Sequence, residues 1–349
     1  MKRRQYGFLR RTSFLLLLGI TTAMIVGGMF IFPRLGATDG FANVCFSQEK
    51  LSEDSQYTID VLLDKVGTND CTSAAGRLAS INELNLMGME IRDLTPLASL
   101  THLKKLVLPD NKIFNLLPLR TLTNLTELDL SNNLVSDLTP LARLNKLEVL
   151  WLWNNKINNI EPLASLSHLQ KLYIAHNEIK DLTPLSKLSK IERVILDDNK
   201  VKDLSPLGSL KQLKGMSFSS NEISDLSPLA SIRGLSVLIF QNNQVQDLAP
   251  LSMLNNLQLL IGNNNQISDI SPLKNLTKLE SLYLNFNQII NINHLSSLID
   301  IIELGLSDNQ ITDSEPINNL FKLKRLDLSN NPLVKEFICP LRPGITCKL

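Results

Sequence analysis

The sequence predicts an α/β solenoid, a stack of short parallel strands with a different cap at each end. Three observations support this prediction. A 22-residue pattern recurs without insertion or deletion from residue 79 onward, a helical pattern precedes it, and the four cysteines lie only outside it. Hydrophobic residues make up 44% of the 349 residues and charged residues 20%, which is typical of a folded chain.

The first 34 residues differ from the rest of the chain. They contain six basic residues, no acidic residue, and an uncharged run of 19 residues from Phe14 to Phe32. This run exceeds the roughly 7–15 apolar residues of a cleaved signal and nearly reaches the ~20 that cross a bilayer as a helix. We expect residues 1–34 to direct export, with the basic side in the cytoplasm. Residues 14–32 then either remain as a membrane anchor or are cleaved, which leaves the chain secreted to the periplasm or the extracellular space.

Residues 35–78 carry the periodicity of a helical cap. Apolar side chains follow the spacing i, i+3, i+4, i+7 twice, at Ile59, Leu62, Leu63 and Val66 and again at Cys71, Ala74, Ala75 and Leu78. This spacing predicts two short helices, each with one apolar face. A solenoid needs such a cap because its first unit otherwise exposes an apolar end.

The repeats occupy residues 79–335. Eleven full units begin every 22 residues from 79 to 299, and a shortened twelfth begins at 321. A well-formed unit is SHLQKLYIAHNEIKDLTPLSKL, residues 167–188. Its Leu-x-Leu segment alternates with period two, which predicts one short strand with its leucines facing inward. No single unit can bury its apolar face, so the units must stack.

Two further columns of the repeat have structural interpretations. An Asn follows the strand in nearly every unit (Asn177 in the unit above), and its amide can satisfy backbone groups of two neighbouring units. A Pro in the second half of the unit (Pro184) predicts a tight turn on the opposite side.

The pattern L-x-x-L-x-L-x-x-N-x-I-x-D-L-x-P-L-x-x-L resembles that of the leucine-rich-repeat family, in the 22-residue type of bacterial internalins and eukaryotic SDS22-like phosphatase regulators. The resemblance covers about residues 79–335. It implies a right-handed horseshoe with the parallel β-sheet on the concave face, short 3-10 turns on the convex side and a helical N-terminal cap. It also implies a protein that binds other proteins.

The cysteines predict two disulfides. Cys45 and Cys71 precede the repeats, and Cys339 and Cys347 follow them. Eleven strand steps of ~4.8 Å separate the two ends by roughly 50 Å, and a disulfide needs Cα atoms within about 7 Å. We therefore expect Cys45–Cys71 in the N-terminal cap and Cys339–Cys347 in a C-terminal cap at residues 336–349, both in keeping with export.

Several function classes are disfavoured. The same separation argues against a four-cysteine metal site, and no two of the four histidines share a metal-ligand spacing. Motifs of serine hydrolases, zinc proteases and P-loop proteins are missing from the sequence, so we predict neither an enzyme nor a cofactor. Beyond residue 34, 29 Lys and Arg oppose 34 Asp and Glu, a net charge of −5 that does not suggest nucleic-acid binding.

The register of the repeat predicts which side chains face the concave side. Positions 5, 7 and 9 of each unit alternate with the buried leucines, and position 10 lies at the rim. Both tryptophans of the chain, Trp151 and Trp153, occupy positions 7 and 9 of the fourth unit, so we expect both to be exposed. The predicted partner-binding residues are Val107, Glu127, Asp129, Val149, Trp151, Trp153, Lys171, Tyr173, Arg193, Ile195, Asp197, Ile239, Ile261, Tyr283 and Phe286, with Val237 and Leu259 adding apolar surface. Apolar anchors with a charged rim are typical of protein-binding surfaces.

Alternative interpretations stay open. Aromatic and β-branched residues favour strands in any case, and Trp151 and Tyr173 can stack simply to stabilise the sheet. Aromatic rings also stack on sugars, so a glycan ligand is an alternative. The repeats alone also fit an SDS22-like regulatory subunit of a phosphatase. Asp197 and Asp198 are an acidic pair that can bind a cation, although such a pair is usually only solvated.

One inward position breaks the leucine pattern. Gly262 stands where other units place a large side chain, directly after Phe218 and Phe240 in the same column. Because protein interiors contain few voids, we predict that the two rings fill the space beside Gly262.

Overall fold

The computed structural model describes residues 40–334 and 345–348. The predicted export segment, with its uncharged run at residues 14–32, and Cys339 lie outside these residues. Within the described ranges, no helix has the length and apolar character that crossing a membrane requires.

Helices form the N-terminal end of the described chain. They are α1 (Phe41–Phe46), the 3-10 helix η1 (Gln48–Lys50), α2 (Glu53–Val66) and α3 (Cys71–Ala79). The predicted apolar faces are confirmed, because Ile59, Leu62, Leu63, Ala74 and Leu78 are buried and Val66, Cys71 and Ala75 pack partly buried against them.

Local side chains set the limits of α2 and α3. The Ser52 hydroxyl accepts a hydrogen bond from the Ser55 amide at 3.2 Å, which caps the start of α2. The helix ends at Gly67, whose φ of 69° is left-handed. The Asp70 carboxylate accepts from the Ser73 amide at 2.7 Å and caps α3.

A disulfide joins α1 to α3, and hydrogen bonds connect the helices to the first two repeats. Cys45 and Cys71 are bonded with their Cα atoms 5.7 Å apart, as predicted. The Thr58 hydroxyl donates to the Asp93 carbonyl at 2.8 Å, and the His102 ring contacts the Leu78 carbonyl at 3.0 Å. The helices therefore cover the open end of the first unit.

The strands form one parallel sheet in which each pairs with the next along the chain. Within the repeats, neighbours pair one repeat of 22 residues apart, for example Leu150 with Leu172; the last pair of strands differs, with Leu326 opposite Cys347. The strands are β1 (Glu83–Asn85), β2 (Lys105–Val107), β3 (Glu127–Asp129), β4 (Val149–Trp151), β5 (Lys171–Tyr173), β6 (Arg193–Ile195), β7 (Gly215–Ser217), β8 (Val237–Ile239), β9 (Leu259–Ile261), β10 (Ser281–Tyr283), β11 (Glu303–Gly305), β12 (Arg325–Asp327) and β13 (Thr346–Lys348).

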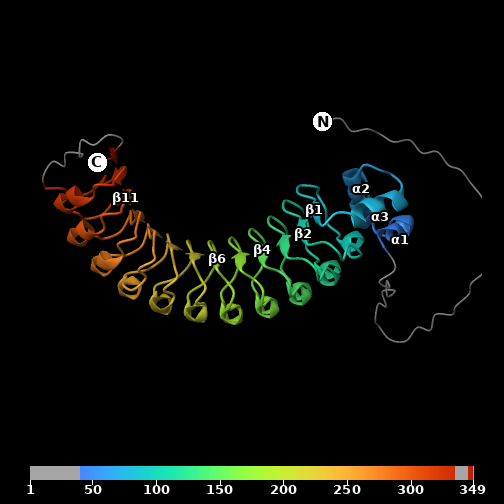
Figure 1. The fold of residues 1–349 in the computed structure, drawn as a ribbon, viewed down its shortest axis with the longest axis horizontal. Helices are drawn as coiled ribbons and strands as arrows, with labels where there is room; N and C mark the ends of the chain where they lie inside the picture. The colour runs from blue at the N-terminus through green and yellow to red at the C-terminus, as the bar shows by residue number, and fades with distance from the viewer. Residues whose placement is uncertain (1–39, 335–344, 349) are drawn as a thin grey trace, which may run out of the picture. The chain divides into compact units, whose positions relative to one another are not determined.

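Short 3-10 helices lie on the opposite side of the repeats. They are η2 (Thr95–Leu97), η3 (Leu117–Thr121), η4 (Thr139–Arg143), η5 (Glu161–Ser165), η6 (Thr183–Lys187), η7 (Ser205–Ser209), η8 (Ser227–Ser231), η9 (Ala249–Leu251), η10 (Ser271–Asn275), η11 (Asn293–Ser297) and η12 (Glu315–Asn319). All but η11 of this series carry the predicted proline in their first turn. The repeats curve so that the strands line the concave side and the 3-10 helices the convex side (Figure 1), as the sequence predicts.

The convex turns have a second recurrent feature that the sequence analysis did not predict. The carboxylate of Asp203 accepts a hydrogen bond from the Ser205 amide at 2.8 Å, just before η7. The hydroxyl and amide of Ser205 hold the pKa of Asp203 below its ordinary value. Equivalent aspartates precede η4, η6, η8 and η10.

The recurring Asn links consecutive units as predicted. The side-chain amide of Asn177 donates to the Leu152 carbonyl of the preceding unit at 3.0 Å and to the Ala175 carbonyl at 3.0 Å. Its carbonyl oxygen accepts from the Ile157 amide at 3.0 Å. Asn177 is buried, so it supplies partners to backbone groups that water does not reach.

The volume prediction for Gly262 is confirmed for the ring of Phe240, while Phe218 contributes only by stacking on that ring. A Cβ atom built on Gly262 would lie 2.5 Å from Cζ of Phe240 and 3.1 Å from Cδ2 of Leu284. The Phe240 ring is itself stacked on Phe218, with centroids 5.9 Å apart. The aromatic ring of the preceding unit therefore occupies the space that a side chain at position 262 would need.

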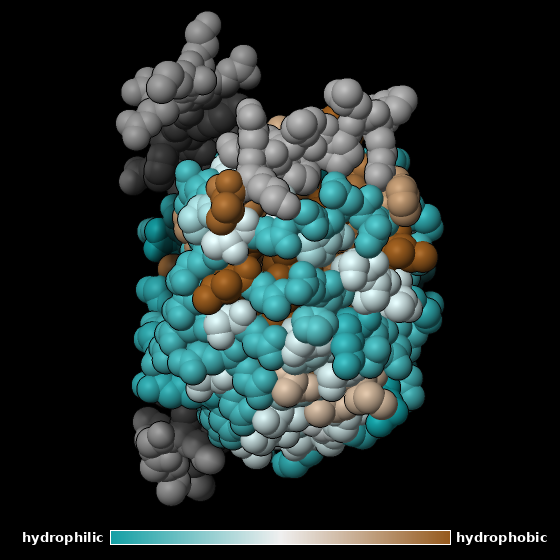
Figure 2. All heavy atoms as spheres, turned by 90° about the vertical axis from the view of Figure 1, so that its left-hand side faces the viewer, coloured by the Kyte–Doolittle hydropathy of each residue, from teal (hydrophilic) through white to brown (hydrophobic). Residues whose placement is uncertain are grey.

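At the C-terminal end, β13 extends the sheet beyond β12. Its central residue, Cys347, is disulfide-bonded; the predicted partner, Cys339, lies outside the described residues. Figure 2 looks at this end of the molecule, where hydrophilic residues cover most of the visible surface and apolar residues form small separate spots.

Candidate binding surface

The concave strands place the predicted residues in regular columns. In most strands the central leucine is buried and its two neighbours are half-buried or exposed, as in Val149-Leu150-Trp151. A residue at position 7 lies directly beside position 7 of the next unit, 22 residues later. Rows of side chains therefore run across the strands along the concave face.

The first apolar cluster centres on Trp151, Tyr173 and Ile195, and Trp153 and Val149 extend it. Trp151 and Tyr173 are stacked with their ring centroids 5.6 Å apart and their planes 6° from parallel. Ile195 pairs with Tyr173 on the next strand. Trp153 follows β4 and is 39% exposed. We call these five residues the tryptophan cluster.

The row of apolar side chains that runs across the strands is interrupted at β7. Gly215 and Ser217 are buried, and the Ser217 hydroxyl donates to the Asp197 carboxylate at 2.5 Å. The same carboxylate oxygen of Asp197 accepts from the Ser219 amide at 2.6 Å. Asp197, predicted to contact a partner, is therefore already engaged in linking two repeats.

A second apolar cluster follows the interruption. It consists of Val237 and Ile239 on β8, Leu259 and Ile261 on β9, and Tyr283 on β10, and all five are half-buried. The central strands of the two clusters, β5 and β9, are four strand steps apart, roughly 20 Å. The apolar residues of the concave face therefore form two clusters, which β7 separates.

Tyr283 covers a gap in the neighbouring strand. A Cβ atom built on Gly305 would lie 2.6 Å from Cδ1 of Tyr283, so the ring extends across that glycine. The Tyr283 hydroxyl donates to the Glu303 carboxylate at 2.6 Å, and Arg325 pairs with Glu303 at 2.9 Å. Burial, with the hydrogen bond to Glu303, raises the pKa of Tyr283 to about 12. Tyr283 is therefore held in place by its own repeats.

Phe286 stands at the rim in an unfavourable backbone conformation. Its φ is 56°, a left-handed value that Gly, Asn and Asp adopt readily and that is strained for a bulky residue. The equivalent position elsewhere holds residues such as Asn242 and Asn264, which hydrogen-bond to each other at 2.8 Å. Phe286 forms no part of such a ladder in the described residues and is 53% exposed. Every repeat has a left-handed residue at this position, so the fold imposes the conformation and Phe286 adopts it at a cost.

Three of the other predicted residues lie on β2 and β3, before the tryptophan cluster, and two lie on the strands of the cluster itself. Val107 is half-buried on β2, Glu127 pairs with Lys105 at 2.9 Å, and Asp129 accepts from the Ser131 amide at 2.9 Å. Lys171 and Arg193 are exposed at the start of β5 and β6.

The rim acids provide no evident cation site. The Asp198 carboxylate lies 3.3 Å from Nδ1 of His176, while Asp197 binds the serines of β7 as described. No group of three or more potential ligands suited to a metal occurs in the described part of the chain.

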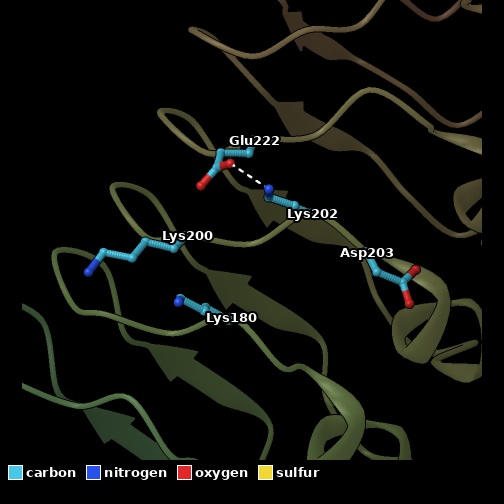
Figure 3. A pocket seen from close by; sticks show the side chains of 5 residues that line it. All are labelled: Lys180, Lys200, Lys202, Asp203 and Glu222. Atoms are coloured by element: carbon cyan, nitrogen blue, oxygen red, sulfur yellow. Dashed lines mark ion pairs between the residues drawn. The ribbon is translucent and has the colours of Figure 1, made fainter.

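A shallow hollow of about 250 Å³ lies beside the sheet rather than on it. Lys180, Lys200, Lys202, Asp203 and Glu222 line it (Figure 3). Lys202 pairs with Glu222 at 3.0 Å, and Lys200 pairs with Glu178 at 3.1 Å. Two of its three lysines are thus neutralised by neighbouring repeats.

A curved parallel sheet built from 22-residue units, with buried leucines and a buried Asn that links consecutive units, defines a leucine-rich-repeat protein. Comparison with known families agrees. A model of paired leucine-rich repeats matches residues 123–165, 145–187, 167–209 and 233–275, and a single-repeat model matches residues 322–343.

Solved structures define the type of repeat protein more closely. An internalin (inlF) from Listeria monocytogenes is 32% identical, with a TM-score of 0.76, and the match covers 79% of this chain and 82% of the internalin. The chain therefore belongs to the internalin-like leucine-rich-repeat family.

More distant structures share the fold. A leucine-rich-repeat protein of Leptospira interrogans is 20% identical with a TM-score of 0.56, over 80% of this chain and 98% of that one. The ectodomain of the receptor kinase GASSHO1/SCHENGEN3 from Arabidopsis thaliana is 24% identical with a TM-score of 0.63, over 74% of this chain and 34% of the receptor chain. A comparison with curated proteins found no match.

Proposed function

We propose that this chain is an exported, non-enzymatic protein that binds a protein partner through its concave face. The tryptophan cluster is the central observation. An exposed indole beside a stacked Trp–Tyr pair is the composition of an interface hot spot, in which a few large aromatic side chains contribute most of the binding energy.

Stabilisation of the sheet does not account for the whole cluster. The stacking of Trp151 on Tyr173 does stabilise two neighbouring strands. Trp153, however, lies beyond the end of β4, at a position where other units place small or polar residues such as Ser131 and Asn263. The exposed indole of Trp153 adds little to strand pairing, and we assign it to partner binding.

Export is supported by the cysteines and by the N-terminal composition. Cys45 and Cys71 form a disulfide, and Cys347 is also disulfide-bonded; such bonds persist in oxidising compartments. The basic and uncharged residues 1–34 fit a signal or an anchor. We propose that the repeats lie outside the cytoplasm, either released or held at the membrane by residues 14–32.

Affinity capture with the full-length chain tests this proposal. Trp151→Ala together with Trp153→Ala should weaken partner binding by about 2 kcal/mol or more, roughly 30-fold in Kd, with an unchanged circular dichroism spectrum. Phe114→Ala is the matched control, because Phe114 is 61% exposed but lies outside the concave strands. Equal capture by both variants would contradict the proposal, and loss of sugar binding alone on a glycan array would favour a glycan ligand.

A further inference from the structure

Two basic residues lie side by side at the start of the strands that carry the tryptophan cluster. Lys171 on β5 and Arg193 on β6 are register partners in the parallel sheet, and both are exposed. Like charges on directly opposed positions of neighbouring strands are destabilising. The fold itself therefore gains nothing from placing these two cations together.

Elsewhere in the same column, cations are matched by acids. Lys105 pairs with Glu127 on the next strand at 2.9 Å, and Arg325 pairs with Glu303 on the preceding strand at 2.9 Å. The residues flanking Lys171 and Arg193 in this column are Val149 and Gly215, which carry no charge. Across the described residues, neither Lys171 nor Arg193 has a carboxylate within ion-pair distance.

Gly215 gives the arginine a defined position. A Cβ atom built on Gly215 would lie 3.5 Å from Nε and 3.7 Å from Cζ of Arg193, so the guanidinium lies over the glycine. Gly215 is buried, although it sits on the concave side of β7. These are ordinary van der Waals distances, so a side chain longer than that of Ala at position 215 would meet the guanidinium. Contact with the sheet restricts the guanidinium, which lowers the entropy lost when it binds a ligand.

The basic pair lies next to apolar surface. Tyr173 and Ile195 are two residues further along the same strands and face the same side. A ligand group bound between the two cations is therefore within one side-chain length of the tryptophan cluster. A guanidinium and an ammonium suit a carboxylate, which the guanidinium can bind through two parallel hydrogen bonds.

We propose that Lys171 and Arg193 bind a carboxylate of the partner, and that the partner presents this Asp or Glu directly beside an aromatic or aliphatic residue that packs on Tyr173 and Ile195. This inference rests on the proposed function of the concave face. The expected ligand is an acidic peptide segment and not a polyanion. The repeats and caps beyond residue 34 carry a net charge of −5 and repel extended negative charge.

Selection of random peptides displayed on phage against the full-length chain tests this inference, with synthetic copies of the selected peptides as probes. Trp151 and Trp153 are the only tryptophans of the chain, so their fluorescence reports binding at the cluster. We expect the selected peptides to carry Asp or Glu next to an apolar residue. Lys171→Gln together with Arg193→Gln should weaken the binding of these peptides by about tenfold, and added salt should also weaken their binding.

Lys105→Gln is the matched control, since Lys105 lies in the same column but is already paired, and it should leave the affinity unchanged. Peptides that perturb the tryptophan fluorescence but lack acidic residues, or bind the Lys171/Arg193 variant equally well, would overturn this inference and leave the proposed function intact. Peptides that leave the fluorescence unperturbed and bind a Trp151→Ala variant normally would overturn both.

Discussion

Substitution of Gly262 by Ala tests the packing of the core directly. The new Cβ atom would lie 2.5 and 2.8 Å from two atoms of the Phe240 ring and 3.1 Å from Leu284, well inside van der Waals contact. Overpacking a close-packed core costs about 1–3 kcal/mol. The lower entropy of Ala in the unfolded chain offsets about 0.4–1 kcal/mol of this, so we expect a net loss of about 1–2 kcal/mol.

Urea unfolding followed by circular dichroism measures this loss. Gly76→Ala is the control, because Gly76 lies inside α3 with no atom within 4 Å of its added Cβ. Replacing a helical Gly should stabilise the chain by about 0.5–1 kcal/mol. The two glycine substitutions therefore have opposite expected signs.

A double variant identifies the cause. Phe240→Leu removes the atoms that meet the added Cβ, so Gly262→Ala should cost less in that background than in the native chain. Non-additivity of this kind marks residues in direct contact. A Gly262→Ala chain as stable as the native one, or a fully additive double variant, would refute the volume argument.

Three further predictions concern the buried Asn of the repeat, Phe286 and the aspartates that precede the 3-10 helices. Asn177→Asp should cost more than about 2 kcal/mol in urea unfolding, because a buried carboxylate cannot donate to the Leu152 carbonyl; an unchanged midpoint would show that water satisfies these groups. Phe286→Asn should stabilise the fold by about 1 kcal/mol through relief of the left-handed strain yet weaken partner binding, and a variant that binds normally would remove Phe286 from the site. Folding lowers the pKa of the capping aspartates, so their stabilising contribution is complete above their unfolded pKa and declines as the pH falls through the folded value. The free energy of unfolding should accordingly decrease in acid, and replacing three of these residues by Asn should flatten that decrease, whereas an identical pH profile would contradict the assignment (Asp181, Asp203 and Asp225).

Much of the architecture is readable from the sequence because every unit has the same length. A strict 22-residue period makes Leu150 pair with Leu172 and aligns every other column with it. The inward leucines, the recurring buried Asn and the convex prolines all follow from that register. The aspartate caps before the 3-10 helices were missed, although an Asp two residues before Ser or Thr in repeat after repeat is a recognisable signal of such a turn.

The candidate site was only partly predictable. The register correctly indicated that Trp153 is exposed, whereas Trp151, also predicted to be exposed, is half-buried. It did not indicate that Asp197 binds Ser217 and Ser219. These contacts join residues 20 and 22 positions apart, and they depend on side-chain rotamers that a repeat pattern does not specify.

The sequence by itself determined the direction in which each side chain points, because alternation along a strand depends only on local backbone geometry and the period is constant. The tertiary structure alone decided which outward side chains remain available. Gly305 admits the ring of Tyr283, and the guanidinium of Arg193 lies in van der Waals contact over Gly215. The availability of a concave residue depends on the volume of its neighbour one repeat away, and that neighbour becomes adjacent only when the solenoid stacks.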